Sequence, residues 1–295
     1  MIDLHMHTTN SDGKRTVIET LKKSEELGLD FISITDHETC NSYKELEKID
    51  IKKYYSGSII PGVEIKCAYN GRIIDILGYC INTEKMNKWL DEKYKYLTHS
   101  IRQEKYLKFQ YNKLTEIGAL MPKYEEIIWD RNHDWATIVM YKILKSNIEN
   151  KNIIPKDMWD SFENYKYNYL YNNKSSFYLD KSKDYVSIKE AIEAIHNCGG
   201  KAFVAHVYIY NWAIDKKAFI EDLTSNYNFD GMECYYSKFT EEQINYIKEV
   251  CKKKKLLLSG GSDSHGYPEI EIGIGRGNLK VPNEILNEWI NINKL

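Results

Sequence analysis

Short apolar runs alternate with helical stretches along the first third of the chain. Strands are predicted by the apolar runs Met1–Met6, Phe31–Thr35, Ile59–Ile65 and Ile73–Tyr79. A helix over Thr16–Leu27 is predicted by apolar residues at helical spacing, which stop at Gly28. Because short strands followed by helices are typical of βα units, the pattern favours a parallel α/β arrangement.

The last third of the chain returns to this pattern. Helices are predicted at Val186–Cys198 and Glu241–Lys254, and strands at Lys201–His206, Gly231–Cys234 and Leu256–Ser259. In parallel α/β folds, active-site residues lie at the carboxyl ends of the strands. The residues that close each apolar run are therefore the first candidates for a functional site.

The middle of the chain has a different character. It is rich in Lys, Tyr, Trp and Asn, and Ile101–Ile117 and Thr137–Ile148 carry helical patterns. We therefore expect an α/β domain made of residues 1–81 and 185–295, interrupted by a helical insertion at residues 82–184. The insertion is either a lid or packing module or a module that contacts substrate, and the sequence leaves both interpretations open.

Ionisable residues gather at the ends of the predicted strands. His5 and His7 are one residue apart, so a strand places both imidazoles on the same face. The others are Asp12, Asp36-His37, Glu64, His206 and Asp263-Ser264-His265. Taken singly, an Asp-Gly pair is usually a turn and a strand-end histidine is usually a core residue. Together, such buried charges would be costly without a metal or partner, so the pattern predicts a multinuclear metal site.

Composition narrows the class of protein. The 295-residue chain has 42% hydrophobic and 28% charged residues, as globular proteins do. Its formal net charge of −2 gives no overall attraction to long duplex nucleic acid or to an anionic membrane.

No apolar run approaches the ~18 residues of a membrane span, and no secretory signal precedes Asp3. The six cysteines form no CxxC pair, so we expect free thiols and a cytoplasmic location.

The motifs resemble those of the PHP (polymerase and histidinol phosphatase) family. Asp3–Gly13 is similar to its first motif, Thr35–His37 to its second and Pro61–Ile65 to its third, while Ala205-His206 and Ser262–His265 resemble the last two. The resemblance is to the stand-alone phosphoesterase subgroup, which includes nucleoside 3′,5′-bisphosphate phosphatases and 5′-3′ exoribonucleases. It implies a distorted (βα)7 TIM-like barrel, with the helical insertion near the active-site mouth, and two or three divalent ions (Mn, Fe or Zn).

The resemblance also implies how the ligands are divided among the ions. One ion would take His5, His7, Glu64 and Asp263, a second Glu64 and His206, and a third Asp12, His37 and His265. The second site departs from the family pattern, because relatives usually carry histidine before a Leu-Gly pair where this chain has Asp75. Aspartate has a shorter reach and a negative charge, so we expect a changed metal affinity at this site.

Substrate contacts are implied by the same comparison. Relatives carry an arginine on a helix after the fourth strand, and Arg102 matches it. Its planar guanidinium suits a phosphate group. The Arg-Pro-His run of those relatives is missing, and Arg131 and His133 are the nearest substitutes.

The implied activity is hydrolysis of phosphate esters of nucleotides or short oligonucleotides through a metal-bound hydroxide. His206 and His265 are candidates for a catalytic proton donor as well as for ligands. One alternative is a histidinol-phosphatase-like enzyme acting on a phosphorylated small molecule, although that branch lacks an insertion at this place. Another is a non-catalytic metal-binding module, although such versions typically lose ligands that this chain keeps.

Overall fold

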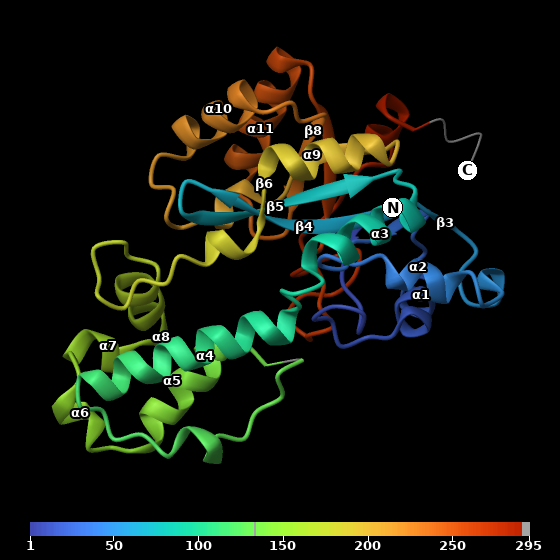
Figure 1. Cartoon of the computed structure of the whole chain (residues 1–295). Helices are drawn as coiled ribbons and strands as arrows, with labels where there is room; N and C mark the ends of the chain where they lie inside the picture. The colour runs from blue at the N-terminus through green and yellow to red at the C-terminus, as the bar shows by residue number, and fades with distance from the viewer. Residues whose placement is uncertain (133, 291–295) are drawn as a thin grey trace. The chain divides into compact units, whose positions relative to one another are not determined.

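The computed structural model describes residues 1–132 and 134–290, and the chain forms two compact units (Figure 1). Unit 1 comprises Met1–Tyr69, Ile73–Glu92 and the described chain from Val186 onward. Unit 2 comprises Asn70–Arg72 and the described residues of Lys93–Tyr185.

Unit 1 contains two sheets. The smaller is parallel, with the order β1-β2-β3, and is built from β1 (Ile2–Met6), β2 (Phe31–Ile34) and β3 (Ser58–Ile59). The larger has the order β6-β4-β5-β7-β8-β9. Its strands are β4 (Gly62–Tyr69), β5 (Arg72–Tyr79), β6 (Val186–Ser187), β7 (Lys201–Val204), β8 (Gly231–Tyr236) and β9 (Leu257–Gly261).

The expectation of a mixed α/β fold rich in parallel pairs is confirmed, with two differences. The parallel arrangement is wrong for β5, which runs antiparallel to β7. Only Asn70 and Gly71 separate β4 from β5, and both have positive φ, which suits a tight hairpin and leaves no room for a crossover helix. A closed barrel is not confirmed, because the described strands form two sheets.

Unit 1 also contains helices. They are α1 (Val17–Glu26), α2 (Asn41–Leu46), α3 (Thr83–Tyr94), α9 (Ile188–Asn197), α10 (Lys216–Asn226) and α11 (Glu241–Lys254), with short turns η1 (Ile51–Lys53), η5 (Val207–Ile209) and η6 (Asn283–Glu288). α1, α9 and α11 each begin with a capping box, which fixes where the chain turns into a helix. α9 packs against β4 and β7, and α11 against β8 and β9.

The predicted helix at Val186–Cys198 begins two positions late because its first residues form β6. Val186 and Ser187 pair in parallel with Cys67 and Ala68 of β4. Ser187 also caps α9, since its side chain accepts a hydrogen bond from the Glu190 backbone. The predicted strand Ile59–Ile65 is likewise divided, into β3 and β4, at Ile60-Pro61.

Unit 2 is helical. It contains α4 (His99–Glu116), η2 (Tyr124–Glu126), α5 (Ala136–Ser146), α6 (Asn150–Ile153), α7 (Lys156–Asp160), α8 (Phe162–Asn164), the π-helix η3 (Tyr165–Leu170) and η4 (Lys181–Asp184). The predicted helices at 101–117 and 137–148 are confirmed as α4 and α5. Leu107, Leu114, Met140 and Leu144 form part of a buried core that lies within this unit.

Unit 1 has its own core. Ile2 and Leu4 of β1 pack with Leu77, Phe203 and Trp289, all of them buried. Every residue of β1 is buried, so the polar residues on this strand face the interior as well. Among the described residues, no helix has the length and apolar character needed to span a membrane.

Candidate metal centre

Side chains alternate along β1, so apolar core residues and potential metal ligands lie on opposite faces of the strand. Leu4 points into the apolar core, while His5 and His7 lie on the opposite face. Both imidazoles are buried, with 0% and 2% exposure, and their ring centroids are 5.3 Å apart. The predicted common direction of this pair is confirmed.

Close backbone approach brings the segment after β9 to the end of β1. The Asp263 backbone N–H donates to the His5 carbonyl at 2.8 Å, and the His7 N–H donates to the Ser264 carbonyl at 2.9 Å. A Cβ on Gly261 would lie 2.4 Å from the His5 nitrogen, so only glycine fits there. Asp263 has φ of 55°, a left-handed conformation that is costly for a non-glycine residue. The strained turn places Asp263 and His265 beside the histidine pair.

A second close approach, between the backbone at Gly13 and that at His7, positions Asp12. A Cβ on Gly13 would lie 2.5 Å from the His7 carbonyl oxygen, so the loop folds tightly back on the strand. The Asp36 carboxylate accepts hydrogen bonds from the Thr8 backbone at 2.7 Å and from the Ser11 hydroxyl at 2.6 Å. These bonds fix the loop that carries Asp12, and Asp36 therefore has a structural role next to His37.

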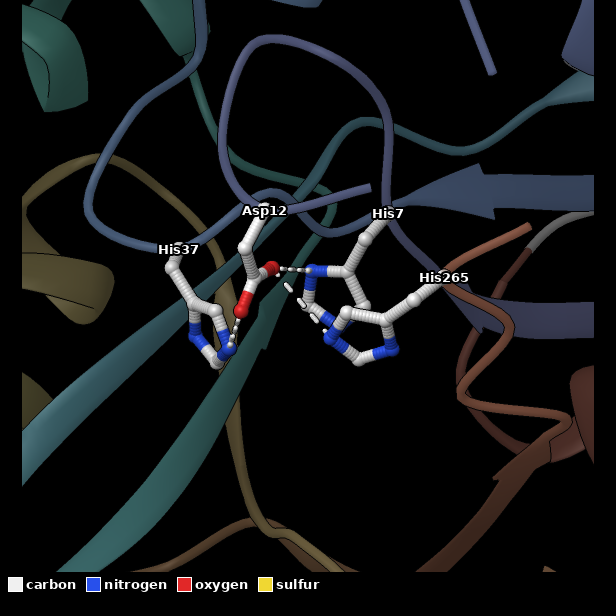
Figure 2. A group of neighbouring side chains, drawn as sticks. All are labelled: His7, Asp12, His37 and His265. Atoms are coloured by element: carbon white, nitrogen blue, oxygen red, sulfur yellow. Dashed lines mark ion pairs between the residues drawn. The ribbon is translucent and has the colours of Figure 1, made fainter. Parts of the chain in front are cut away.

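The first group of potential ligands is His7, Asp12, His37 and His265. Figure 2 shows Asp12 between His37 on one side and the rings of His7 and His265 on the other. Asp12 Oδ1 lies 3.2 Å from His265 Nε2 and 3.9 Å from His7 Nδ1, and Oδ2 lies 3.7 Å from His37 Nε2. The His265 Nδ1 lies 3.0 Å from the Asp263 carbonyl, so an Nδ1–H donor leaves Nε2 to face Asp12.

The second group is His5, His7, Glu64 and Asp263. Glu64 Oε2 lies 3.2 Å from Nε2 of both histidines. Asp263 Oδ1 lies 3.4 Å from His5 Nε2 and 3.2 Å from His7 Nε2. This is the set that the resemblance implied for one ion.

The third group is His37, Glu64 and Asp75. His206, which the resemblance assigned to an ion with Glu64, approaches that residue with Nε2 3.1 Å from Oε1. His206 is not a member of this group. Its histidine is His37, whose Nδ1 lies 3.2 Å from Glu64 Oε2. The three groups overlap pairwise, because His7, Glu64 and His37 each belong to two of them.

The charges of these groups are strongly coupled. Burial disfavours a charged His7, but the carboxylates of Asp263 and Glu64 raise its pKa to about 10. Burial likewise disfavours a charged Glu64, but the His5 imidazolium holds its pKa well below the usual range. Without an ion the centre therefore keeps negative carboxylates beside protonated His5 and His7, whereas burial and the Lys66 ammonium hold the pKa of His37 well below its usual value. An ion that binds His5 and His7 must displace protons.

The donor chemistry fits divalent metal ions. Imidazole nitrogen and carboxylate oxygen together suit Zn, Mn and Fe. Among the described residues, both ring nitrogens of His7 and the Asp12 Oδ1 atom are buried, and their ionic contacts, at 3.2 Å or longer, lack hydrogen-bond geometry. Such atoms are costly to bury unless a ligand satisfies them. His5, His7, Asp12, His37, Glu64, Asp75, Asp263 and His265 are therefore the residues that could hold the ions, and His206, 3.1 Å from Glu64, stays a predicted ligand.

Stability of the metal-free protein is expected to decrease at alkaline pH. The pKa of His7 rises from 6.5 to about 10 on folding, so the native state holds a proton that the unfolded chain releases. This stabilisation is complete below pH 6.5 and is lost as pH rises through about 10. Thermal unfolding with chelator between pH 7 and 10 measures it, and His7→Ala should weaken the dependence. A constant Tm in the unmodified protein would contradict the assignment.

Glu233 is a buried residue of the site that the sequence analysis missed. Its Oε1 lies 2.9 Å from His5 Nδ1, and its Oε2 accepts a hydrogen bond from the His206 backbone at 2.8 Å. Donation from His5 Nδ1 leaves Nε2 with the lone pair that faces Glu64. The only sequence signal is one carboxylate inside the apolar run Gly231–Cys234.

Loss of this orienting contact should weaken metal binding. We expect Glu233→Ala to raise the Kd for Mn²⁺ by about 10- to 100-fold, because the His5 ring loses the acceptor that fixes it. Isothermal titration calorimetry measures the change independently of turnover. Glu242→Ala, at an exposed position of α11, is the matched control. Equal affinities in the two variants would show that Glu233 does not position His5.

The predicted substrate residues lie in unit 2. Arg102 is buried, its guanidinium carbon lies 5.1 Å from the Tyr94 ring centre and 4.7 Å from that of Tyr185, and Nη1 donates to the Leu97 carbonyl. These contacts give Arg102 a packing role within its unit, and its contact with phosphate stays a prediction. Arg131 pairs with Glu104 at 3.2 Å, and His133 lies outside the described residues.

Comparisons with known proteins agree with the site. The PHP domain model matches residues 3–197. The chain is 27% identical over 299 residues to a 5′-3′ exoribonuclease of Haemophilus influenzae, covering 97% of each chain. It is 24% identical over 275 residues to a phosphoribosyl 1,2-cyclic phosphate 1,2-diphosphodiesterase of Eggerthella lenta, covering 90% of this chain and 94% of the relative.

The fold is shared with a solved structure. A crystal structure from Bifidobacterium adolescentis, described as that of a metal-dependent phosphoesterase, superposes with a TM-score of 0.64 at 19% identity. The match covers 97% of this chain and 94% of that one. Since the family model spans more than half of the sequence and includes His5, His7 and Glu64, the chain belongs to the PHP domain family.

Proposed function

We propose that this chain is a metal-dependent phosphoesterase that hydrolyses phosphate esters of nucleotides or short oligonucleotides. The observation that carries the proposal is the pairwise overlap of the three ligand groups through His7, Glu64 and His37. Shared ligands hold ions a few ångströms apart, as multinuclear phosphoesterase centres require. The names of the exoribonuclease and cyclic phosphate diphosphodiesterase relatives support the substrate class.

The residues of the centre would each have a defined task. Bound divalent ions would neutralise charge on phosphate oxygens and lower the pKa of nearby water. His7, Glu64 and His37 would set the spacing between ion positions, since each belongs to two groups. Glu233 would orient His5 through the 2.9 Å contact to Nδ1.

We propose His206 as the proton donor to the leaving oxygen. Although burial opposes its charge, Glu64 raises the pKa of His206 in the metal-free protein. Its Nδ1 atom is buried and has no hydrogen-bond partner within the described part of the chain. His265 is less suited to this task, because Nδ1 already faces the Asp263 carbonyl and Nε2 faces Asp12.

Two further features belong to the proposal. The two sheets of unit 1 are linked by backbone hydrogen bonds from β1 to the segment after β9, an arrangement that supports a distorted barrel of the (βα)7 type. We propose that unit 2 forms most of the helical insertion expected at residues 82–184, although residues 82–92 of that range belong to unit 1. We propose that it serves substrate binding, and a cytoplasmic location stays a prediction.

A comparison of substrates tests the function. Phosphate release is measured from 3′-phosphoadenosine 5′-phosphate, AMP and histidinol phosphate with Mn²⁺, and again after chelation. We expect turnover of a nucleotide substrate that is lost with chelator. Preference for histidinol phosphate would favour the small-molecule alternative. Bound metal with no turnover of these esters or of a short 5′-phosphorylated RNA would favour a non-catalytic module.

A further inference from the structure

Lys66 is a cationic residue within the metal centre that no ligand assignment includes. It follows Glu64 by two positions on β4, so the alternation of the strand sends both side chains to the same side. The Lys66 Nζ atom lies 2.8 Å from His37 Nδ1, 2.9 Å from His37 Nε2 and 3.5 Å from Asp75 Oδ1. Its side chain is only 16% exposed, which is unusual for a lysine.

These distances place the ammonium at the third ligand group. His37 and Asp75 are two of the three members of that group, and both contact Lys66. The ammonium occupies the space between the His37 ring and Asp75 Oδ1 that an ion bound by both residues would need. An ion at this position would therefore have to displace Lys66 and would then lie next to its positive charge.

The surroundings hold Lys66 in this position. Its backbone N–H donates to the Glu38 carboxylate at 3.2 Å, which ties this part of β4 to the segment after β2. On the other side, the Tyr210 hydroxyl donates to Asp75 Oδ2 at 3.1 Å, so the opposite oxygen faces Lys66. The third group is also the poorest in neutral donors, with one histidine, whereas the first group has three.

The departure at position 75 has a physical explanation in this arrangement. Asp75 is a carboxylate in direct contact with the Lys66 ammonium. Asp75 supplies one negative charge at 3.5 Å and forms a neutral pair with the ammonium. Lysine and aspartate together thus provide both the cation and its counter-charge.

We propose that the Lys66 ammonium is the resident cation of the third group, so that this chain binds two divalent ions and uses a lysine in place of a third. The inference rests on the metal centre of the proposed function. The two ions would occupy the groups His7, Asp12, His37, His265 and His5, His7, Glu64, Asp263.

Metal stoichiometry tests the proposal without reference to turnover. The full chain and its variants are equilibrated with Mn²⁺, dialysed, and analysed for manganese per chain by elemental analysis. We expect two ions in the unmodified protein and three in Lys66→Met, whose side chain keeps the length of the stem without the charge. Lys48→Met, at an exposed lysine of unit 1, is the control and should hold two. Asp75→Asn, which keeps Lys66, should also hold two.

The outcomes separate this inference from the proposed function. Three ions in the unmodified protein, or two in a Lys66→Met variant with native circular dichroism, would overturn the role of Lys66 alone. No bound ion in the unmodified protein would overturn the metal centre itself. If Lys66→Met does not fold, the unmodified protein and Asp75→Asn still decide, because loss of an ion in Asp75→Asn would identify Asp75 as a ligand.

Discussion

Replacement of His7 by alanine is expected to abolish phosphoester hydrolysis and to weaken both ions of the centre. His7 is the residue shared by the first two ligand groups, and its Nε2 lies 3.2 Å from both Glu64 and Asp263. We expect kcat/KM to decrease by about three orders of magnitude, equivalent to ~4 kcal/mol of transition-state stabilisation. Phosphate release and manganese content, measured on the same preparation, check the result.

The control for this variant is another histidine of unit 1. His196→Ala removes an imidazole whose Nε2 pairs with Asp230 at 2.7 Å on the sheet-packing helix α9. It should keep full turnover and both ions. Native circular dichroism of His7→Ala would exclude unfolding as the cause of its loss. Full activity in a folded His7→Ala protein would disprove the assignment of His7 to the centre.

Glu64→Gln is expected to have the second largest effect, with a different pattern of metal loss. The Glu64 carboxylate approaches four imidazoles, those of His5, His7, His37 and His206, at 3.1 to 3.2 Å. Glutamine keeps the shape but removes the negative charge and one acceptor oxygen. The group that lacks Glu64 contains Asp12 and three histidines, so it should keep its ion.

The expected result is therefore one retained ion per chain and a loss of about three orders of magnitude in kcat/KM, or ~4 kcal/mol. Manganese analysis and phosphate release measure the two effects separately. Glu47→Gln, at an exposed position just after α2, should leave both unchanged. Two retained ions in Glu64→Gln would show that this carboxylate does not join the ligand groups.

Much of the fold could be predicted from local sequence signals. Helix ends coincide with capping residues and glycines, as Thr16 and Gly28 do around α1. The differences between the predicted and the observed elements have physical causes that hydrophobic periodicity does not reveal. The antiparallel direction of β5 depends on a hairpin of two residues, and β6 consists of only Val186 and Ser187, too few for an alternating pattern.

The candidate site was predictable to a similar extent. The spacing of His5 and His7 encodes a shared direction, and donor residues at strand ends indicate a common edge. Glu233 and Lys66 gave no such signal, because one charged residue on a strand is usually solvent-exposed. Glu233 meets His5 across 228 positions of the sequence, a contact that only packing creates.

By itself, the sequence determined the donor types, the alternation that aligns His5 with His7, and the glycines that allow close approach at Gly13 and Gly261. These properties depend on neighbouring residues and on steric limits within a few bonds. Only the tertiary structure decided which donors are shared between groups, and that the Lys66 ammonium lies beside His37 and Asp75. The reason is geometric: ångström distances between side chains from separate strands follow from how the sheets pack, and no local pattern records that packing.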